Sequence, residues 1–137
     1  MTKENEKLMR VVCRHCHQVL SHPLRSFSSD DRIRLKDRES SFDNGLILSV
    51  QEFRNRSGLL IDSFPADWVV HNESVVNCTP DNSTFGCCGC TPNGKANLMC
   101  RCGNLVGSEW SDCIDICLTV FQNQMVFIIP NGMESEL

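Results

Sequence analysis

Cysteines carry the clearest chemical signal in this chain of 137 residues, which contains ten of them. Cys13 and Cys16 form a C-x2-C pair near the start, and Cys100 and Cys102 form a C-x-C pair that is followed by Gly103. A structural zinc ion takes four ligands in a tetrahedron, and two closely spaced cysteines can supply two of them from one tight turn. Neither pair completes a site alone. We therefore predict one structural zinc ion, bound by Cys13, Cys16, Cys100 and Cys102.

Three more cysteines, Cys87, Cys88 and Cys90, lie on a glycine-bearing turn. They could form an open three-thiolate zinc site, the second zinc of the chain, with its fourth position kept for water or substrate. They could instead include a reactive thiol whose pKa is lowered by a cation such as Lys95 or Arg101. The third interpretation is a structural turn in which they pack as small hydrophobic side chains.

A local alternative to the long-range zinc site also stays open. Cys88 and Cys90 could complete a site with the nearby C-x-C pair, which leaves the C-x2-C pair in need of other ligands. Neutral imidazole from His15 or His17 would be suited to that role. With four cysteines available, we expect both histidines to be polar neighbours of the turn rather than ligands.

The state of the cysteines depends on the compartment. The chain opens with the polar stretch MTKENEKLMRVVCRHC, which has no apolar run of the length of a signal peptide. We therefore expect a cytoplasmic protein, because clustered cysteines in a reducing cytosol bind metal or do chemistry more often than they form disulfides. Iron–sulfur clusters also use four cysteines, but the spacings known for them do not include this C-x-C pair.

Charge and hydropathy exclude two classes of partner. Residues 1–58 hold eleven Lys and Arg against eight Asp and Glu, a net of +3, while residues 59–137 hold two against nine, a net of −7. No dense basic patch with interleaved aromatic residues occurs, so a nucleic-acid partner is not expected. No apolar run reaches the roughly 18 residues that a membrane-spanning helix needs, so no membrane partner is expected either.

Short apolar runs indicate the elements that must position these cysteines. They are rich in β-branched residues and bounded by Asn, Ser, Gly, Pro or Asp, which is typical of strands. The runs comprise residues 8–12, 46–50, 59–61, 68–70, 74–76, 113–121 and 125–129. We predict that the last two pair with each other, and that His71, Asn72 and Glu73 form a hairpin turn.

The chain length favours one domain over residues 1–137. The polar segment 23–44 mixes both signs of charge without a clear period, so we predict a mobile loop there, with a short helix starting at Ser29 or Asp30. A flexible tail is expected at about residues 131–137. The prediction is an all-β domain of about seven to nine strands.

With its two cysteine pairs and the run Gly103 to Gly107, the chain resembles the β-tent, or Mss-like, superfamily. The resemblance implies two small antiparallel sheets that meet at an angle and are pinned by one zinc ion held by two distant cysteine pairs. Members include Yippee proteins, the thalidomide-binding domain of cereblon, methionine sulfoxide reductase B and the glutathione-dependent formaldehyde-activating enzymes. The last of these also combine a C-x-C with a C-x2-C pair, and hold a second zinc ion with further cysteines.

Two hypotheses about function follow. The first is a zinc-stabilised binding module that holds a protein or a small cyclic ligand in a cleft near the cysteine pairs. The resemblance to cereblon-type domains implies tryptophans there, so Trp110, Asp112 and Trp68 are the candidate ligand-binding residues. The second is a zinc- or thiol-dependent enzyme that uses Cys87, Cys88 and Cys90 on a small thiol or aldehyde substrate.

Overall fold

The computed structural model describes residues 7–34, 42–59, 61, 63–81, 89, 92, 96–111 and 117–136. Within these residues the strands form two sheets, one of two strands and one of seven. The prediction of an all-β fold with two sheets is therefore confirmed. The sheets are unequal in size, and the larger one contains a parallel pair of strands.

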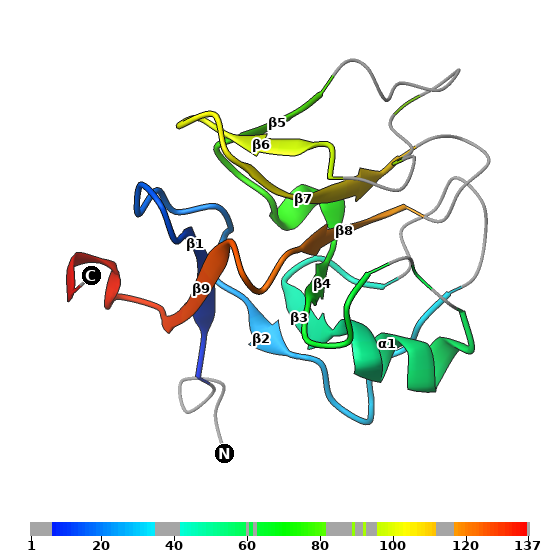
Figure 1. The fold of residues 1–137 in the computed structure, drawn as a ribbon. Coiled ribbons are helices and arrows are strands. Elements are labelled where there is room, and N and C mark those ends of the chain that lie inside the picture. The colour runs from blue at the N-terminus through cyan, green and yellow to red at the C-terminus, as the bar shows by residue number, and fades with distance from the viewer. Residues whose placement is uncertain are drawn as a thin grey trace.

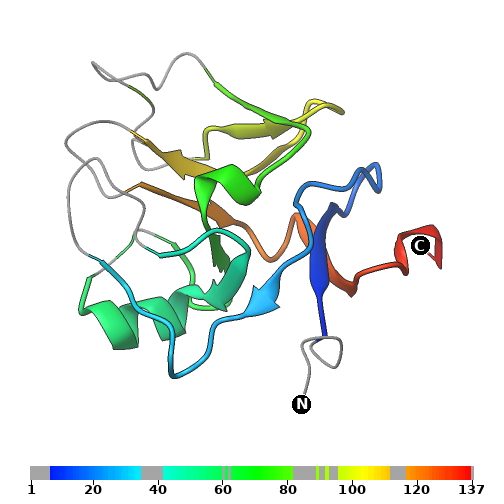
Figure 2. The same ribbon diagram turned by 180° about the vertical axis from the view of Figure 1, so that it is seen from behind.

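The small sheet joins the two ends of the described chain. Strand β1 (Met9–Cys13) pairs antiparallel with β9 (Val126–Pro130), so that Cys13 lies opposite Val126 at one end of the sheet. Figures 1 and 2 show β1 and β9 side by side, next to the larger sheet. After β1 the chain folds back along it, with isolated bridges from Val12 to Val19 and from Met9 to Leu24.

The large sheet has the strand order β2-β3-β4-β8-β7-β6-β5. Its strands are β2 (Arg25–Ser26), β3 (Leu46–Ser49), β4 (Trp68–Val70), β5 (Cys78–Pro80), β6 (Leu98–Cys100), β7 (Leu105–Trp110) and β8 (Leu118–Phe121). Only β2 and β3 run parallel, and every other neighbouring pair is antiparallel. Strands β6 and β7 form a tight hairpin, whose tip faces the turn after β1 in both views (Figures 1 and 2).

Helix α1 (Val50–Ser57) directly follows β3 and was not predicted. The Ser49 side chain accepts a hydrogen bond from the Glu52 amide at 3.1 Å, and Gly58 ends the helix with a φ of 77°. Ser49 and Glu52 form the S-x-x-E pattern of a capping box, and the glycine is the usual residue for the left-handed position after a helix. These signals were present in the sequence. Among the residues that the structure describes, η2 (Asn72–Ser74) and η4 (Glu134–Glu136) are short 3-10 helices.

Buried side chains form two clusters, one on each face of the large sheet. The first joins the large sheet to the small one through Val11, Leu20, Leu24 and Val126, packed against Ile47, Val70, Leu98, Val106 and Phe121. The second packs Val50 and Phe53 of α1 against Leu48, Val69 and Val120 of the sheet. Successive residues of a strand point to opposite faces, which explains how neighbours such as Val69 and Val70 enter different clusters.

Several predictions of elements are wrong. Residues 59 and 61 lie in a loop, and the Arg54 side chain donates to the Ile61 carbonyl at 2.7 Å. Ser74 belongs to η2, and Val75 makes only an isolated bridge, to Ser21. The predicted hairpin turn at 71–73 therefore leads into a 3-10 helix instead of reversing between strands.

The predicted pairing of the last two apolar runs is also wrong. Strand β8 pairs with β4 on one side and β7 on the other, so neither of its edges is open to β9. Strand β9 pairs with β1 instead. The turn at residues 122–125 thus carries the chain from the large sheet to the small one. Residues 113–116 of the predicted strand lie outside the described residues.

The described part of the segment 23–44 includes a short strand and a turn. It contains β2, and in the turn that follows the Asp31 carboxylate accepts hydrogen bonds from the Arg25 guanidinium at 3.1 Å and from the Ser28 amide at 2.7 Å. No helix starts at Ser29 or Asp30, because this turn is closed by the aspartate side chain. In the described part of the chain, no helix has the length and apolar character needed to cross a bilayer.

Candidate metal centre

The first cysteine pair lies on the turn that ends β1. The Cys13 carbonyl accepts from the His17 amide at 2.9 Å, and the Cys13 amide donates to the Gln18 carbonyl at 2.9 Å. His17 has a φ of 64°, a left-handed conformation that is uncommon for residues other than glycine. The turn therefore holds Cys13 and Cys16 on one side while the chain reverses.

The second pair lies on the tip of the β6–β7 hairpin, in a similar turn that is one residue shorter. The Cys100 carbonyl accepts from the Gly103 amide, and the Cys100 amide donates to the Asn104 carbonyl, both at 2.9 Å. Gly103 takes the left-handed position with a φ of 94°. The C-x-C and C-x2-C pairs thus make equivalent knuckles, in each of which the residue after the second cysteine has a positive φ.

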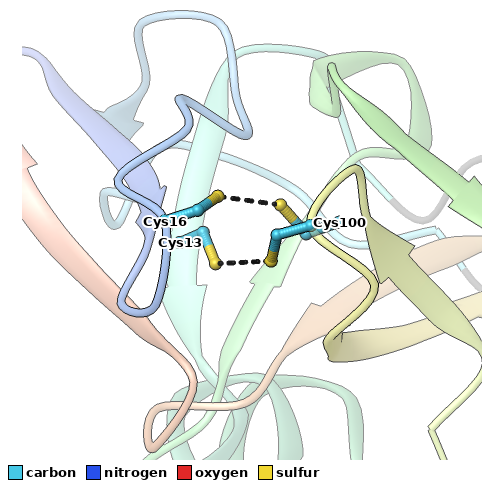
Figure 3. A group of neighbouring side chains, drawn as sticks. Cys13, Cys16 and Cys100 are labelled. Carbon is cyan, nitrogen blue, oxygen red and sulfur yellow. Dashed lines mark hydrogen bonds between the residues drawn. The ribbon is translucent and has the colours of Figure 1, made fainter.

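The two knuckles bring four sulfur atoms together from the two sheets. The Sγ atoms of Cys13 and Cys102 lie 3.8 Å apart, and those of Cys16 and Cys100 lie 3.5 Å apart. All four Sγ atoms lie within 4.8 Å of one another, so they could hold a metal ion. Figure 3 shows the side chains of Cys13 and Cys16 pointing toward the opposite knuckle, which carries Cys100. Neither His15 nor His17 belongs to this group.

One cysteine of each pair is buried, Cys13 or Cys100, and the other, Cys16 or Cys102, is exposed. Burial raises the pKa of the Cys13 thiol and also that of Cys100. At Cys102 the pKa is lowered to about 6, because the Asn104 side chain donates to its Sγ at 3.3 Å and the Asn104 backbone amide also donates. Cys102 is therefore ready to act as a thiolate, whereas the buried pair needs the charge of a bound cation to lose its protons.

A fifth cysteine, Cys78, lies beside this group and was missed from the sequence. It is the register partner of Cys100 across β5 and β6, so the two side chains are on the same face. Burial, followed by the nearby sulfurs of the group, raises the pKa of Cys78 to about 12. Cys78 is not one of the four cysteines whose sulfur atoms converge. No other cysteine lies within seven residues of it in the sequence, so no spacing pointed to it.

Arg14 fixes the first knuckle to the small sheet. Its Nη2 atom donates to the Asn123 carbonyl at 3.3 Å and to the Val126 carbonyl at 3.2 Å, and its guanidinium lies 4.2 Å from the centre of the Phe127 ring. The His17 ring also contacts Phe127, with a centroid distance of 6.3 Å. These contacts give the Cys13 knuckle a fixed position relative to β9.

The two candidate tryptophans lie on opposite faces of the large sheet. Trp68 is paired with Phe121 and packs with the cluster that contains Cys13 and Cys100, and its Nε1 atom donates to Asn123 Oδ1 at 3.1 Å. Trp110 is paired with Leu118 and packs with the cluster under α1. The structure therefore does not bring them together as one wall, and only Trp68 adjoins the cysteine group.

Asp112 and the cysteines 87, 88 and 90 lie outside the described residues, as does Lys95. Gly89, which is described, packs so closely against the end of β7 that an added Cβ atom would lie 2.5 Å from the Ser111 carbonyl oxygen. Gly89 therefore has a packing role, because any larger residue at this position would collide with the Ser111 backbone.

A shallow hollow of about 410 Å³ is lined by Lys7, Arg25, Ser26 and Ser28. Lys7 precedes β1 and Cys13 ends it, so this hollow lies at the opposite end of that strand from the cysteine group. Arg25 and Asp31 form an ion pair beside the hollow, and the hydrogen bonds from Arg25 hold the pKa of Asp31 well below its usual range. It forms no part of the metal centre.

Comparison of the chain with protein families, with curated proteins and with solved structures returned no match. The geometry of the four cysteines is therefore the main guide to function.

Proposed function

We propose that the chain is a zinc-stabilised binding module. The observation that carries this proposal is the convergence of four cysteine sulfurs from two knuckles on different sheets. Zinc bonds thiolate sulfur at about 2.3 Å, which puts the sulfurs of a tetrahedral site about 3.8 Å apart. The separations of 3.5 and 3.8 Å agree with such a site. Soft thiolate ligands also favour zinc over magnesium or calcium.

The role of the ion is structural. Four protein thiolates fill a tetrahedral zinc site, which leaves no position for water or substrate. The ion links residues 84 and 89 positions apart in sequence and ties the small sheet to the β6–β7 hairpin. A structural zinc contributes on the order of 10 kcal/mol, comparable to the whole net stability of a domain. The pinning of two sheets by distant cysteine pairs also supports placing the chain with the β-tent superfamily.

Binding takes place at the rim of the knuckles. Cys16 and Cys102 are exposed there, together with Arg14, His15, Arg101 and Leu105. A fixed surface of charged and apolar groups suits a protein partner. The placement of the two tryptophans on opposite faces gives less support to a cage for a small flat ring. Ligation by thiolates requires reduced cysteines, so we assign the protein to a reducing compartment such as the cytoplasm.

X-ray absorption at the zinc edge of the purified protein tests the proposal. We expect one zinc ion per chain with four sulfur neighbours at about 2.3 Å. A nitrogen or oxygen neighbour, or a second zinc ion with fewer sulfurs, would instead support the catalytic alternative. A protein free of zinc that is stably folded would contradict the proposal outright.

A further inference from the structure

Cys78 and Cys100 occupy the position in an antiparallel pair that suits a disulfide. Asp81 and Asn97 lie three positions further along the same register than Cys78 and Cys100. The Asp81 amide donates to the Asn97 carbonyl at 2.6 Å, so these two residues form a hydrogen-bonded pair. Hydrogen-bonded and non-hydrogen-bonded pairs alternate along such a ladder, so Cys78 and Cys100 form a non-hydrogen-bonded pair. The hydrogen bond of the Cys100 amide is consistent with this assignment, because this amide donates to the Asn104 carbonyl in its own knuckle and not to Cys78.

The spacing of such a pair fits a cross-link. Cα atoms in a non-hydrogen-bonded pair lie about 4.5 Å apart, and disulfides span Cα separations of about 4.4 to 6.8 Å. Both side chains are on the same face of the sheet, and Cys78 packs against the cluster that contains Cys100. Cys100 is buried, and the half-buried Cys78 opposite it is the more open of the two, so hydrogen peroxide must reach the pair from the Cys78 side.

We propose that Cys78 and Cys100 are a modification site at which peroxide oxidation forms a disulfide and displaces the metal. The Cys100 thiolate attacks the O–O bond of hydrogen peroxide, which yields a sulfenic acid and hydroxide. The Cys78 sulfur then attacks the sulfenic sulfur, its proton leaves with the hydroxyl as water, and the S–S bond forms. One thiolate, one thiol and one peroxide thus become one disulfide, one water and one hydroxide.

The cross-link removes a ligand that no other described residue replaces. Zinc is left with Cys13, Cys16 and Cys102, two of which are exposed to solvent. The inference rests on the proposed zinc centre, because Cys100 must be one of its ligands for oxidation to release the ion. A thiol reductant reverses the step by exchange and restores the four-sulfur site.

The experiment treats the zinc-loaded full chain with hydrogen peroxide and follows released zinc with a chromophoric chelator. Samples are alkylated, digested without reduction and searched by mass spectrometry for linked peptides. We expect a peptide pair joined through Cys78 and Cys100. In Cys78→Ser we expect that link to be absent and zinc release to slow several-fold. Cys117→Ser, which changes a half-buried cysteine outside the group, is the matched control and should release zinc like the wild type.

Two results would overturn the inference: equal zinc release from Cys78→Ser and wild type, or a wild-type peptide map in which Cys100 is joined to Cys16 or to any residue other than Cys78. The peptide map needs no variant, so it decides the question even where Cys78→Ser folds poorly. Failure of the proposed function looks different, because the untreated wild type would then contain no zinc.

Discussion

Cys78 and Cys100 face each other across β5 and β6, yet only Cys100 belongs to the converging group. Comparing Cys100→Ser with Cys78→Ser therefore distinguishes the loss of a zinc ligand from the same substitution at a neighbouring position that is not a ligand. Structural zinc binding is worth about 10 to 16 kcal/mol, so a quarter share for each of four thiolates is about 2.5 to 4 kcal/mol. Cys100→Ser should therefore lower zinc affinity by about two to three orders of magnitude. Cys78→Ser should lower the free energy of unfolding by about 1 kcal/mol and leave the zinc affinity unchanged.

Competition with a chromophoric zinc chelator measures the affinity, and urea unfolding with and without zinc measures the stability. In the presence of zinc, Cys100→Ser should unfold at much lower urea than the wild type, whereas Cys78→Ser should stay close to it. The reasoning is refuted if both variants lose zinc equally, or if Cys100→Ser keeps the affinity of the wild type.

Three further predictions concern single contacts. Asn104→Ala removes the side-chain hydrogen bond to Cys102 Sγ and should weaken zinc binding about 10-fold to 100-fold by chelator competition; an unchanged affinity would contradict the role of that bond. Gly103→Ala and Gly132→Ala both place alanine at a φ near +90° with open space around the added Cβ atom, so each should lower the free energy of unfolding by about 1 kcal/mol. Only Gly103→Ala should also lower zinc affinity, and an equal loss in Gly132→Ala would count against the knuckle geometry. Burial lowers the pKa of His71 from its usual 6.5, so the unfolded state binds the proton more readily and stability falls as the pH drops below about 6.5. Urea unfolding across pH should show a smaller loss in His71→Asn, whereas parallel profiles would rule out this contribution.

The two cysteine pairs could be predicted from the sequence, because their ability to bind a metal depends on local spacing. A C-x2-C or C-x-C pair is set by a turn of a few residues, and the structure forms both turns with one residue of positive φ. Gly103 indicates the position of positive φ in the second turn, because glycine adopts this conformation without strain. His17 gives no comparable signal, and its conformation depends on the hydrogen bonds of the turn.

Long-range pairing could not be predicted in the same way. The alternation in residues 113–121 indicated a strand, but not that both of its edges would be occupied by β4 and β7. The position of Cys78 opposite Cys100 likewise depends on the register of β5 and β6, which no local pattern specifies. The separation of Trp68 from Trp110 has the same origin, since the face of each side chain follows from its register. Helix α1 is different, because its capping residues Ser49, Glu52 and Gly58 are local signals that could have predicted it from the sequence.

Cadmium substitution followed by NMR tests the central claim most directly. Cadmium takes the place of zinc in thiolate sites, and its couplings to cysteine β-protons identify the ligands one by one. The account predicts couplings to Cys13, Cys16, Cys100 and Cys102 from a single bound ion. Couplings confined to one knuckle, or ligation by any of the cysteines 87, 88 and 90 in place of the first pair, would contradict it.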